Sequence, residues 1–178
     1  MTSDDDLMRA AQRGNRDAFE QLFERYRTLI WRFFRRRTPD PDAAAELAQD
    51  VFVALIQRAR QYEPRGSFRS YLFGIAFNVL SVWRRQSGRT GAAWPDDFDP
   101  PGESPDLSAV MWVRQALAEL DDGDREILML REYEALRYDE IATALDLPLN
   151  TVRSRLFRAR FALKAKLEAR REVEGVHP

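Results

Sequence analysis

The chain has 178 residues, 44% of them hydrophobic, and its 28 Lys and Arg side chains nearly balance 29 Asp and Glu, for a formal net charge of −1. This composition predicts one ordinary globular domain or two small ones and excludes wholesale disorder. The absence of cysteine excludes disulfides and thiolate metal sites and suits a reducing compartment. The acidic first residues lack the order of a signal peptide, and no apolar run could cross a bilayer, so we expect a cytoplasmic protein without membrane insertion.

Helical periodicity dominates the first half of the chain. Apolar residues at steps of three and four predict an amphipathic helix over residues 17–37, with Asn15 as its N-cap. Asp40, followed by Pro41, predicts the start of a second helix, and Ser67 that of a third. The apolar stripe of the first helix is Phe19, Leu22, Phe23, Tyr26, Leu29, Ile30, Phe33 and Phe34. The inward face of the second is expected to be Ala44, Leu47, Val51 and Leu55.

Residues 87–107 differ in composition, because Pro, Gly and Ser cluster there and acids outnumber the single base, Arg89. The acids are Asp96, Asp97, Asp99, Glu103 and Asp106. Such a segment buries too little apolar surface to fold alone, so we expect a flexible acidic linker. No stretch alternates cleanly, so no sheet is expected. We therefore predict an all-α protein with two small helical domains, 1–86 and 108–172, and a tail, 173–178.

Residues 138–160 have the pattern of a helix-turn-helix. A short helix is expected to turn Ile141, Ala142 and Leu145 inward, and after a tight turn at 146–149 a second helix is expected behind Asn150 as N-cap. The inward stripe of that helix is Val152, Leu156, Ala159, Leu163 and Leu167. Its remaining early positions are Thr151, Arg153, Ser154, Arg155 and Arg158. A recognition helix presents its first turns to base edges and its cations to phosphates.

Between residues 147 and 167 the chain carries six Arg or Lys side chains and no acid. The simpler interpretation is a solvated amphipathic helix, since runs of charge usually face water. Solvent-exposed helices generally carry both acidic and basic residues, however, because like charges four residues apart repel each other by a few tenths of a kcal/mol. Together with the turn just upstream, this favours nucleic-acid binding.

Two stretches of the first domain could bind a partner as well as contribute to the hydrophobic core. The helix AELAQDVFVAL has an outward face that is acidic and partly apolar, although a face of this kind can also be an ordinary solvent-exposed surface without a partner. The stretch from Tyr62 to Arg85 interleaves aromatics with arginines beside a Pro-Gly loop, a combination that can stack and hold unpaired bases. Several of these aromatics must nevertheless belong to the core.

In their order and spacing these segments resemble the bacterial RNA polymerase sigma factors, specifically the extracytoplasmic-function (ECF) group of the sigma-70 family. The resemblance runs from about Asp17 to Leu167. DAFEQLFERY is similar to the opening helix of the family, ELAQDVFVAL to its polymerase-binding helix, and SFRSYLFGIAFN to the helix after its promoter-melting loop. The stretch from Arg125 to Arg160 is similar to the reader of the minus-thirty-five promoter element.

The resemblance implies an alternative sigma factor, which binds core RNA polymerase, directs it to promoters and promotes strand opening without being an enzyme. It implies contacts to the largest-subunit coiled coil and the flap of the polymerase, to promoter DNA both double-stranded and melted, and to an anti-sigma factor, and it implies no catalytic residue, cofactor or metal. The implied polymerase-binding residues are Glu46, Gln49, Asp50 and Val53. The implied residues for the minus-ten element and its flipped base are Tyr62, Arg65, Gly66, Ser67, Phe68 and Asn78. Those implied for the minus-thirty-five element are Asn150, Thr151, Arg153, Ser154, Arg155 and Arg158.

The chain departs from the family pattern at a few positions. Phe77 and Val82 stand where Arg and Asp are frequent, which bears on the minus-ten preference. Arg137 replaces a capping Ser, and Asp146 replaces a common turn Gly, although Asp tolerates the left-handed conformation better than most residues.

Two other classes of protein compete with this resemblance. An enzyme is disfavoured, since the single histidine, His177, lies in a polar tail and there is no Gly-rich phosphate loop. The nearer rival is a stand-alone helix-turn-helix transcriptional regulator that acts without polymerase.

Overall fold

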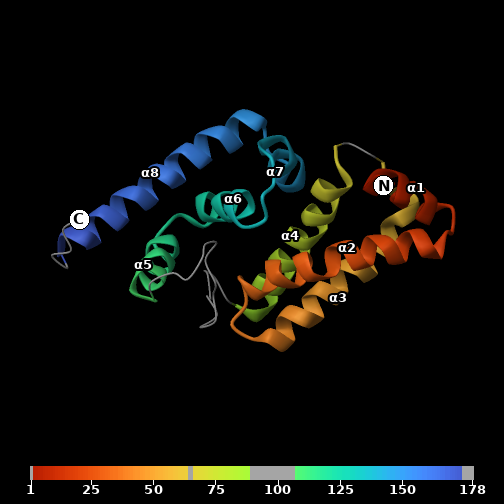
Figure 1. Cartoon of the computed structure of the whole chain (residues 1–178), viewed down its shortest axis with the longest axis horizontal. Coiled ribbons are helices and arrows are strands. Elements are labelled where there is room, and N and C mark those ends of the chain that lie inside the picture. Colours follow the sequence, from red (N-terminus) through yellow and green to blue (C-terminus); the bar gives the residue numbers. More distant parts are fainter. Residues whose placement is uncertain (1, 64–65, 89–106, 174–178) are drawn as a thin grey trace.

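The computed structural model describes residues 2–63, 66–88 and 107–173, which form helices and connecting turns with no strand among them. Four helices form a first group: α1 (Asp4–Gln12), α2 (Arg16–Arg35), α3 (Pro41–Arg58) and α4 (Phe68–Ser87), with a short 3₁₀ turn, η1 (Ala59–Gln61), after α3. Four more form a second group: α5 (Leu107–Ala118), α6 (Asp122–Glu132), α7 (Tyr138–Leu145) and α8 (Leu149–Val173). Figure 1 shows the two groups meeting where α7 lies beside α4. The all-α prediction is confirmed.

Three helices begin where the sequence predicts. Asn15 Oδ1 accepts the Ala18 N–H at 3.1 Å, Asp40 Oδ1 accepts the Asp42 N–H at 2.9 Å, and Ser67 Oγ accepts the Ser70 N–H at 3.2 Å. Each bond satisfies a backbone donor that the first turn of a helix leaves without a partner. The predicted inward face of α3 is buried in full.

The first group contains one helix that the sequence reasoning missed. α1 begins behind Ser3, whose Oγ accepts the Asp6 N–H at 3.1 Å, and its first turn is wholly acidic, which suits the positive end of the helix dipole. Leu7 and Met8 are its only buried side chains. A sequence pattern with two apolar core positions in nine residues gives little periodicity to detect.

The apolar stripe of α2 is wider than the core it covers. Five of its residues are buried: Leu22, Tyr26, Ile30, Phe33 and Phe34. Phe23, by contrast, is 37% exposed, and Trp31, two turns further along the helix, is 38% exposed. These two side chains face an open groove between α2 and α3, so the prediction of a single core-facing stripe is only partly right.

In the second group, the turn between α7 and α8 is as expected, but the start of α8 is not. Asp146 adopts the left-handed conformation with φ of 52° and ends α7, while Glu140 accepts the Arg137 N–H at 2.9 Å and supports its start. α8 begins at Leu149, so Asn150 lies inside the helix and the prediction that it is the N-cap is wrong. Its Oδ1 instead accepts a hydrogen bond from Arg153 Nη1 at 3.3 Å.

Of the predicted linker, only the ends are described: Ser87 closes α4, Gly88 follows it, and Leu107 opens α5. The five acids of the linker lie outside the described residues, as do Arg65 and His177. The predicted tail from residue 173 begins inside α8, because that helix continues to Val173.

The two groups meet at a contact that we call the junction, formed by Arg37, Arg69, Gly74, Arg84, Glu126, Glu134 and Ala144. Arg37 Nε donates to Glu126 at 2.7 Å, and its Nη1 donates to Glu134 at 3.0 Å. α4 crosses α7 closely, since a side-chain carbon at Gly74 would lie 3.2 Å from the Ala144 carbonyl oxygen. No local sequence pattern predicts this contact.

The polar groups at the junction are not all satisfied. Among the described residues, Arg37 Nη2, Arg69 Nε and Arg84 Nε are buried without a hydrogen-bond partner. Burial also lowers the pKa of the Arg84 guanidinium from its ordinary value, although the nearby Glu126 carboxylate opposes the change. A buried donor without a partner loses the hydration it would have in water, which weakens the net gain from the contact.

Candidate functional site

The outward face of α3 is open to solvent. Glu46, Gln49 and Asp50 are all exposed, and Val53 is 44% exposed. Glu46 and Asp50 border a hollow of about 320 Å³ between α3 and α4, whose lining also includes Asn78. This face therefore combines carboxylates with apolar surface.

A larger groove of about 660 Å³ lies on the other side of the same helix, between α2 and α3. Gln49 and Val53 line it together with Phe23, Trp31 and Phe52. The rings of Phe23 and Phe52 meet edge to face, with centroids 4.8 Å apart. The acidic hollow and the apolar groove thus flank one helix, and the four predicted α3 residues are divided between them.

The predicted residues around the minus-ten loop are largely held inside the fold. Tyr62 is 5% exposed and Phe68 1% exposed, with their ring centroids 6.2 Å apart, and Tyr71 packs 4.9 Å from Tyr62. The Tyr62 hydroxyl donates to Asp5 Oδ1 at 2.5 Å. Burial, reinforced by this bond, raises the pKa of Tyr62 well above its ordinary value. The aromatic rings of this stretch are therefore mainly core.

The structure brings Tyr62, Ser67 and Asn78 to one cavity of about 400 Å³, which the α7 segment from Thr143 to Asp146 closes on one side. The Ser67 hydroxyl donates to Glu140 at 2.7 Å, across the two groups of helices. Gly66 lies beside Thr143, and Asn78 is exposed. Thus α7 covers part of the region to which the sequence assigns the flipped base.

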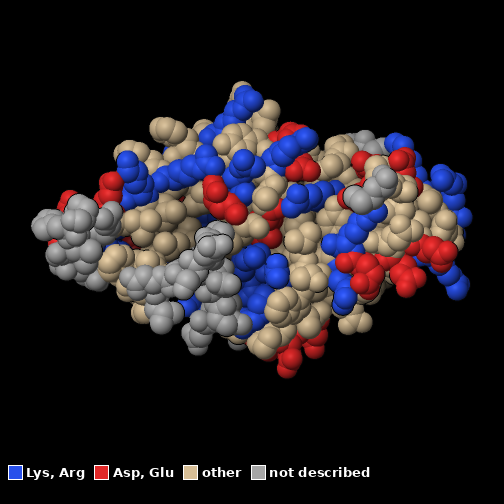
Figure 2. Space-filling view, viewed as in Figure 1, with Lys and Arg blue, Asp and Glu red and all other residues tan. Residues whose placement is uncertain are grey.

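The basic side chains of α8 are displayed along the helix, and Figure 2 shows Lys and Arg following it across the upper left of the molecule. Asn150, Arg153, Ser154 and Arg158 are exposed, whereas Thr151 is half-buried. Arg158 pairs with Asp124 at 3.2 Å but keeps 64% of its side chain exposed. All six predicted positions thus lie within the first turns of one helix.

Arg155 differs from its neighbours on α8, because it lies half-buried against the start of α6. A side-chain carbon at Gly123 would stand only 2.7 Å from Arg155 Nη1, so the guanidinium lies directly against the start of α6 and would have to shift to accommodate a side chain there. The N-cap of α6, Asp121, accepts the Gly123 N–H at 3.0 Å at the same place. Arg155 is therefore partly engaged in holding α8 on α6.

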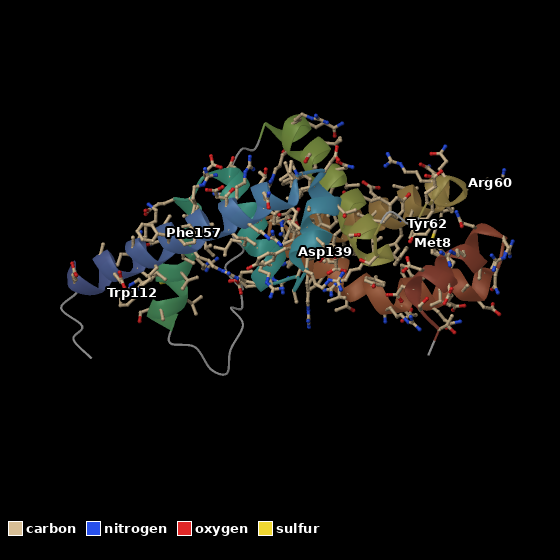
Figure 3. The ribbon with its side chains drawn as sticks, turned by 90° about the horizontal axis from the view of Figure 1, so that it is seen from above. Met8, Arg60, Tyr62, Trp112, Asp139 and Phe157 are labelled. Carbon is tan, nitrogen blue, oxygen red and sulfur yellow. The ribbon has the colours of Figure 1, made fainter. Side chains whose placement is uncertain are left out.

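The structure also reveals a residue that the sequence reasoning missed. Phe157, labelled in Figure 3, is 73% exposed and lies one turn after Arg153 on α8. A large apolar side chain so exposed among cations is suited to contact an apolar group of a partner, such as a thymine methyl group. Its signal in the sequence is that it stands outside the inward stripe that includes Leu156 and Ala159.

Two family models match the chain. The model of Sigma-70 region 2 matches residues 22–90, which include α3 and α4, and that of Sigma-70 region 4 matches residues 111–163, which include α6, α7 and the start of α8. The RNA polymerase sigma factor YlaC of Bacillus subtilis is 31% identical over 173 residues, covering 91% of this chain and 99% of the relative. The ECF RNA polymerase sigma-E factor of Escherichia coli is 27% identical over 182 residues, covering 93% and 95%.

Among solved structures, CnrH in complex with the cytosolic domain of CnrY is similar, with a TM-score of 0.73 and 26% identity, covering 94% of this chain and 99% of that one. The chain therefore belongs to the sigma-70 family of RNA polymerase sigma factors. Within that family it is a factor of the ECF group, an alternative sigma factor that acts in transcription initiation, and the comparisons do not favour a stand-alone regulator. Within the described ranges, no helix combines the length and apolar character that a membrane span needs.

Proposed function

We propose that this sigma factor works through three surfaces: the outward face of α3 binds core polymerase, the first turns of α8 recognise the minus-thirty-five element, and the loop before α4 captures a base of the opened minus-ten strand. We infer a division into a region 2 domain, 1–86, and a region 4 domain, 108–172. One observation carries the proposal: the acidic exposed face of α3 and the cationic exposed face of α8 lie on different helical groups. A chain with opposite charge on separate groups can hold a basic protein and DNA at once.

The polymerase contact would be made by Glu46, Gln49, Asp50 and Val53. Their exposed carboxylates complement a basic coiled coil of the largest subunit, and the neighbouring apolar groove supplies surface that gains free energy on burial. The second helical group would contact the polymerase flap. Because charges at such an interface mainly set association rate and specificity, charge reversal is the sharpest test of this surface.

The DNA contact of α8 would follow helix-turn-helix geometry, with the helix in the major groove and its N-terminal residues at base edges. Arg153 and Arg158 have the exposure to reach phosphates or guanine edges, and Asn150, Thr151 and Ser154 supply shorter polar groups. Each phosphate that an arginine neutralises releases counterions, so the affinity should fall steeply with salt concentration.

Strand opening would be driven by binding of the open form, without covalent chemistry and without enzymatic activity. An extruded base captured near Ser67 and Asn78 offsets part of the cost of unstacking, which is a few kcal/mol. Because α7 forms one wall of that cavity in this structure, a movement of α7 away from α4 would widen the entrance for a base. The same movement would free α8 to reach a separate upstream element.

A cytoplasmic location and regulation by an anti-sigma factor complete the proposal. Its support is the likeness to CnrH, whose structure was solved in complex with the cytosolic domain of CnrY. An anti-sigma factor could act on this chain by holding the junction closed or by covering the α3 face. No cofactor or metal is part of the proposed mechanism.

The experiment that tests the proposal is run-off transcription with purified chain, core polymerase and promoter fragments from the same genome. The holoenzyme should start defined transcripts, whereas the chain alone should bind promoter DNA weakly. Tight binding to a palindromic site without polymerase would instead support the stand-alone regulator.

Charge reversal on α3 tests the polymerase contact itself. Glu46→Lys combined with Asp50→Lys should reduce capture of core polymerase by about tenfold, an expectation of order 1.4 kcal/mol for a charged face. Glu168→Lys with Glu172→Lys, four residues apart on exposed positions of α8 in the other helical group, makes the same change in net charge and serves as the control. Equal loss in both double variants would remove the α3 face from the interface.

A further inference from the structure

The outward side of α8 carries two large apolar side chains that the hydrophobic core does not use. Phe157 is 73% exposed and Phe161 is 70% exposed, the highest values among the large hydrophobic side chains of the described ranges. The two residues are four positions apart, so both rings lie on one face of the helix. The opposite face holds the buried Val152, Leu156 and Ala159. The packing of α8 therefore does not explain the two rings.

The two rings fit a spacing with which recognition helices reach base edges. A homeodomain helix reads the major groove with side chains at steps of three, four and seven residues. On α8 the same steps from Ser154 lead to three further exposed residues, Phe157, Arg158 and Phe161. The family model of Sigma-70 region 4 matches residues 111–163, so the matched segment includes both rings. Phe161 thus belongs to the face that the proposed function turns toward DNA.

Cations border the two rings on both sides. The helical repeat of 3.6 residues places Arg153 and Arg160 on one side of the rings and Arg158 on the other. All three are exposed, although Arg158 pairs with Asp124 and Arg160 with Glu132. A major groove has the complementary pattern, with base edges between two rows of phosphates. A second copy of this face would bring cations against cations, so the charges favour a DNA duplex as the partner.

The groove offers one apolar group that a phenyl ring can cover. Among the groups that base pairs expose there, the apolar one is the C5-methyl group of thymine. Covering it removes apolar surface of both partners from water, which is favourable. At a rise of about 1.5 Å per residue, Phe161 lies about 6 Å beyond Phe157 along the helix. Because base pairs are spaced by about 3.4 Å, the two rings would meet methyl groups about two base pairs apart.

We propose that Phe161, together with Phe157, determines sequence specificity by covering thymine methyl groups in the upstream duplex. Phe161 extends the recognised sequence by about two base pairs beyond the contact of Phe157. This inference rests on the proposed function, in which α8 enters the major groove of the minus-thirty-five element. The arginines beside the rings supply affinity through phosphates, whereas the rings distinguish thymine from the other bases.

Deoxyuridine allows a direct test, because it differs from thymidine only in lacking the C5-methyl group. Holoenzyme is assembled from the full chain and core polymerase and titrated against duplexes that carry the upstream element. Each thymine in the element and in the flanking base pairs is replaced by deoxyuridine in turn. The wild type should lose affinity by about three- to fivefold at two positions, as expected for the burial of one methyl group at each. Replacement of the other thymines should leave the affinity unchanged.

Substitutions then assign each methyl group to a ring. Phe161→Ala should lower affinity for the thymine duplex by about three- to fivefold and abolish the response to deoxyuridine at one of the two positions. Phe157→Ala should abolish the response at the other position. Phe161→Leu keeps an apolar side chain and should retain most of the response. Met111→Ala is the matched control: Met111 is apolar and 56% exposed but lies on α5, so this variant should respond to deoxyuridine as the wild type does.

Several outcomes would overturn the proposal. Equal affinity of the wild type for all the duplexes would do so, as would a methyl response that survives both alanine substitutions. A loss of core-polymerase binding by Phe161→Ala, with the methyl response intact, would assign the ring to a protein interface. Should Phe161→Ala fail to fold, Phe161→Gln keeps a long side chain without the apolar ring and must show the same loss. A wild-type holoenzyme that does not bind the upstream element would instead overturn the proposed function.

Discussion

Arginine serves different purposes in the two helical groups. Arg37, in the first group, is 2% exposed, and its guanidinium bonds to two glutamates and to the Phe33 carbonyl, with the Phe33 ring centroid 3.8 Å away. Arg153, in the second, is exposed on α8, where its partner is the neutral Asn150. The environment, and not the residue type, therefore decides whether a cation stabilises the fold or remains available to an anionic partner.

The largest effect of a substitution is expected at the buried arginine, Arg37. Arg37→Ala leaves Glu126 and Glu134 buried without their main partner, so the packed arrangement should lose about 3–5 kcal/mol. We expect the two groups to separate, which small-angle X-ray scattering would detect as a larger radius of gyration. Arg153→Ala is the control and should leave the radius unchanged. A compact Arg37→Ala protein would show that apolar contacts between α4 and α7 suffice to hold the junction.

The next largest effect is expected at Arg153 when the measurement is DNA binding. Arg153→Ala should weaken holoenzyme binding to a duplex with the minus-thirty-five element by about 1–3 kcal/mol if the side chain contacts a base. Because the side chain is exposed, the free energy of unfolding should change by less than about 0.5 kcal/mol. Equilibrium binding at several salt concentrations, together with urea unfolding, measures both quantities. A loss of stability without a loss of affinity would contradict the assignment.

Gly74 tests the junction without touching a charge. Gly74→Ala should favour an isolated α4 by about 0.5–1 kcal/mol, since alanine is the better helix former, but its methyl group meets the Ala144 carbonyl at 3.2 Å. We therefore expect a shift of up to about 1 kcal/mol toward the separated arrangement. Faster amide exchange in α7, with unchanged exchange in α3, is the predicted signature. Slower exchange in α7 would mean that the helices adjust to the methyl group.

The smallest effect is expected at Asp124, the partner of Arg158. Asp124→Asn removes the competing carboxylate and keeps the shape, and because the Arg158 side chain is 64% exposed, the pair contributes about 0–1 kcal/mol. Affinity for the minus-thirty-five duplex should rise by no more than that amount, as measured by fluorescence anisotropy. Weaker binding would instead show that Asp124 orients Arg158 for DNA.

The starts of three helices were predictable because their determinants are local. The caps at Asn15, Asp40 and Ser67 bond to backbone groups two or three residues away, so the sequence alone contains both partners. The helix α1 was missed because its anchoring is distant: Asp4 meets Tyr26, and Asp5 meets Tyr62. Both partners are more than twenty residues away in the sequence, so the residues around 4–12 do not predict them.

In the candidate site, too, the features set by local sequence were predictable and those set by tertiary packing were not. Helical periodicity was enough to place Glu46 and Asp50 on the outside of α3 and Arg153 on the outside of α8. It could not distinguish Tyr62, which is buried, from an aromatic side chain displayed for stacking, since both fit one pattern. Nor could it foresee that Glu140 of α7 would reach Ser67, because that contact depends on how two helical groups pack.

The nitrogen atoms of Arg37, Arg69 and Arg84 that lack partners at the junction have a consequence for the chain in its separated form. The junction combines these charged groups with apolar contacts between α4 and α7, and when the two groups part, water can satisfy the three nitrogens. Separation of the two groups therefore restores hydrogen bonds to these three side chains, which offsets part of the free energy lost with the contact and keeps the closed and open arrangements close in stability.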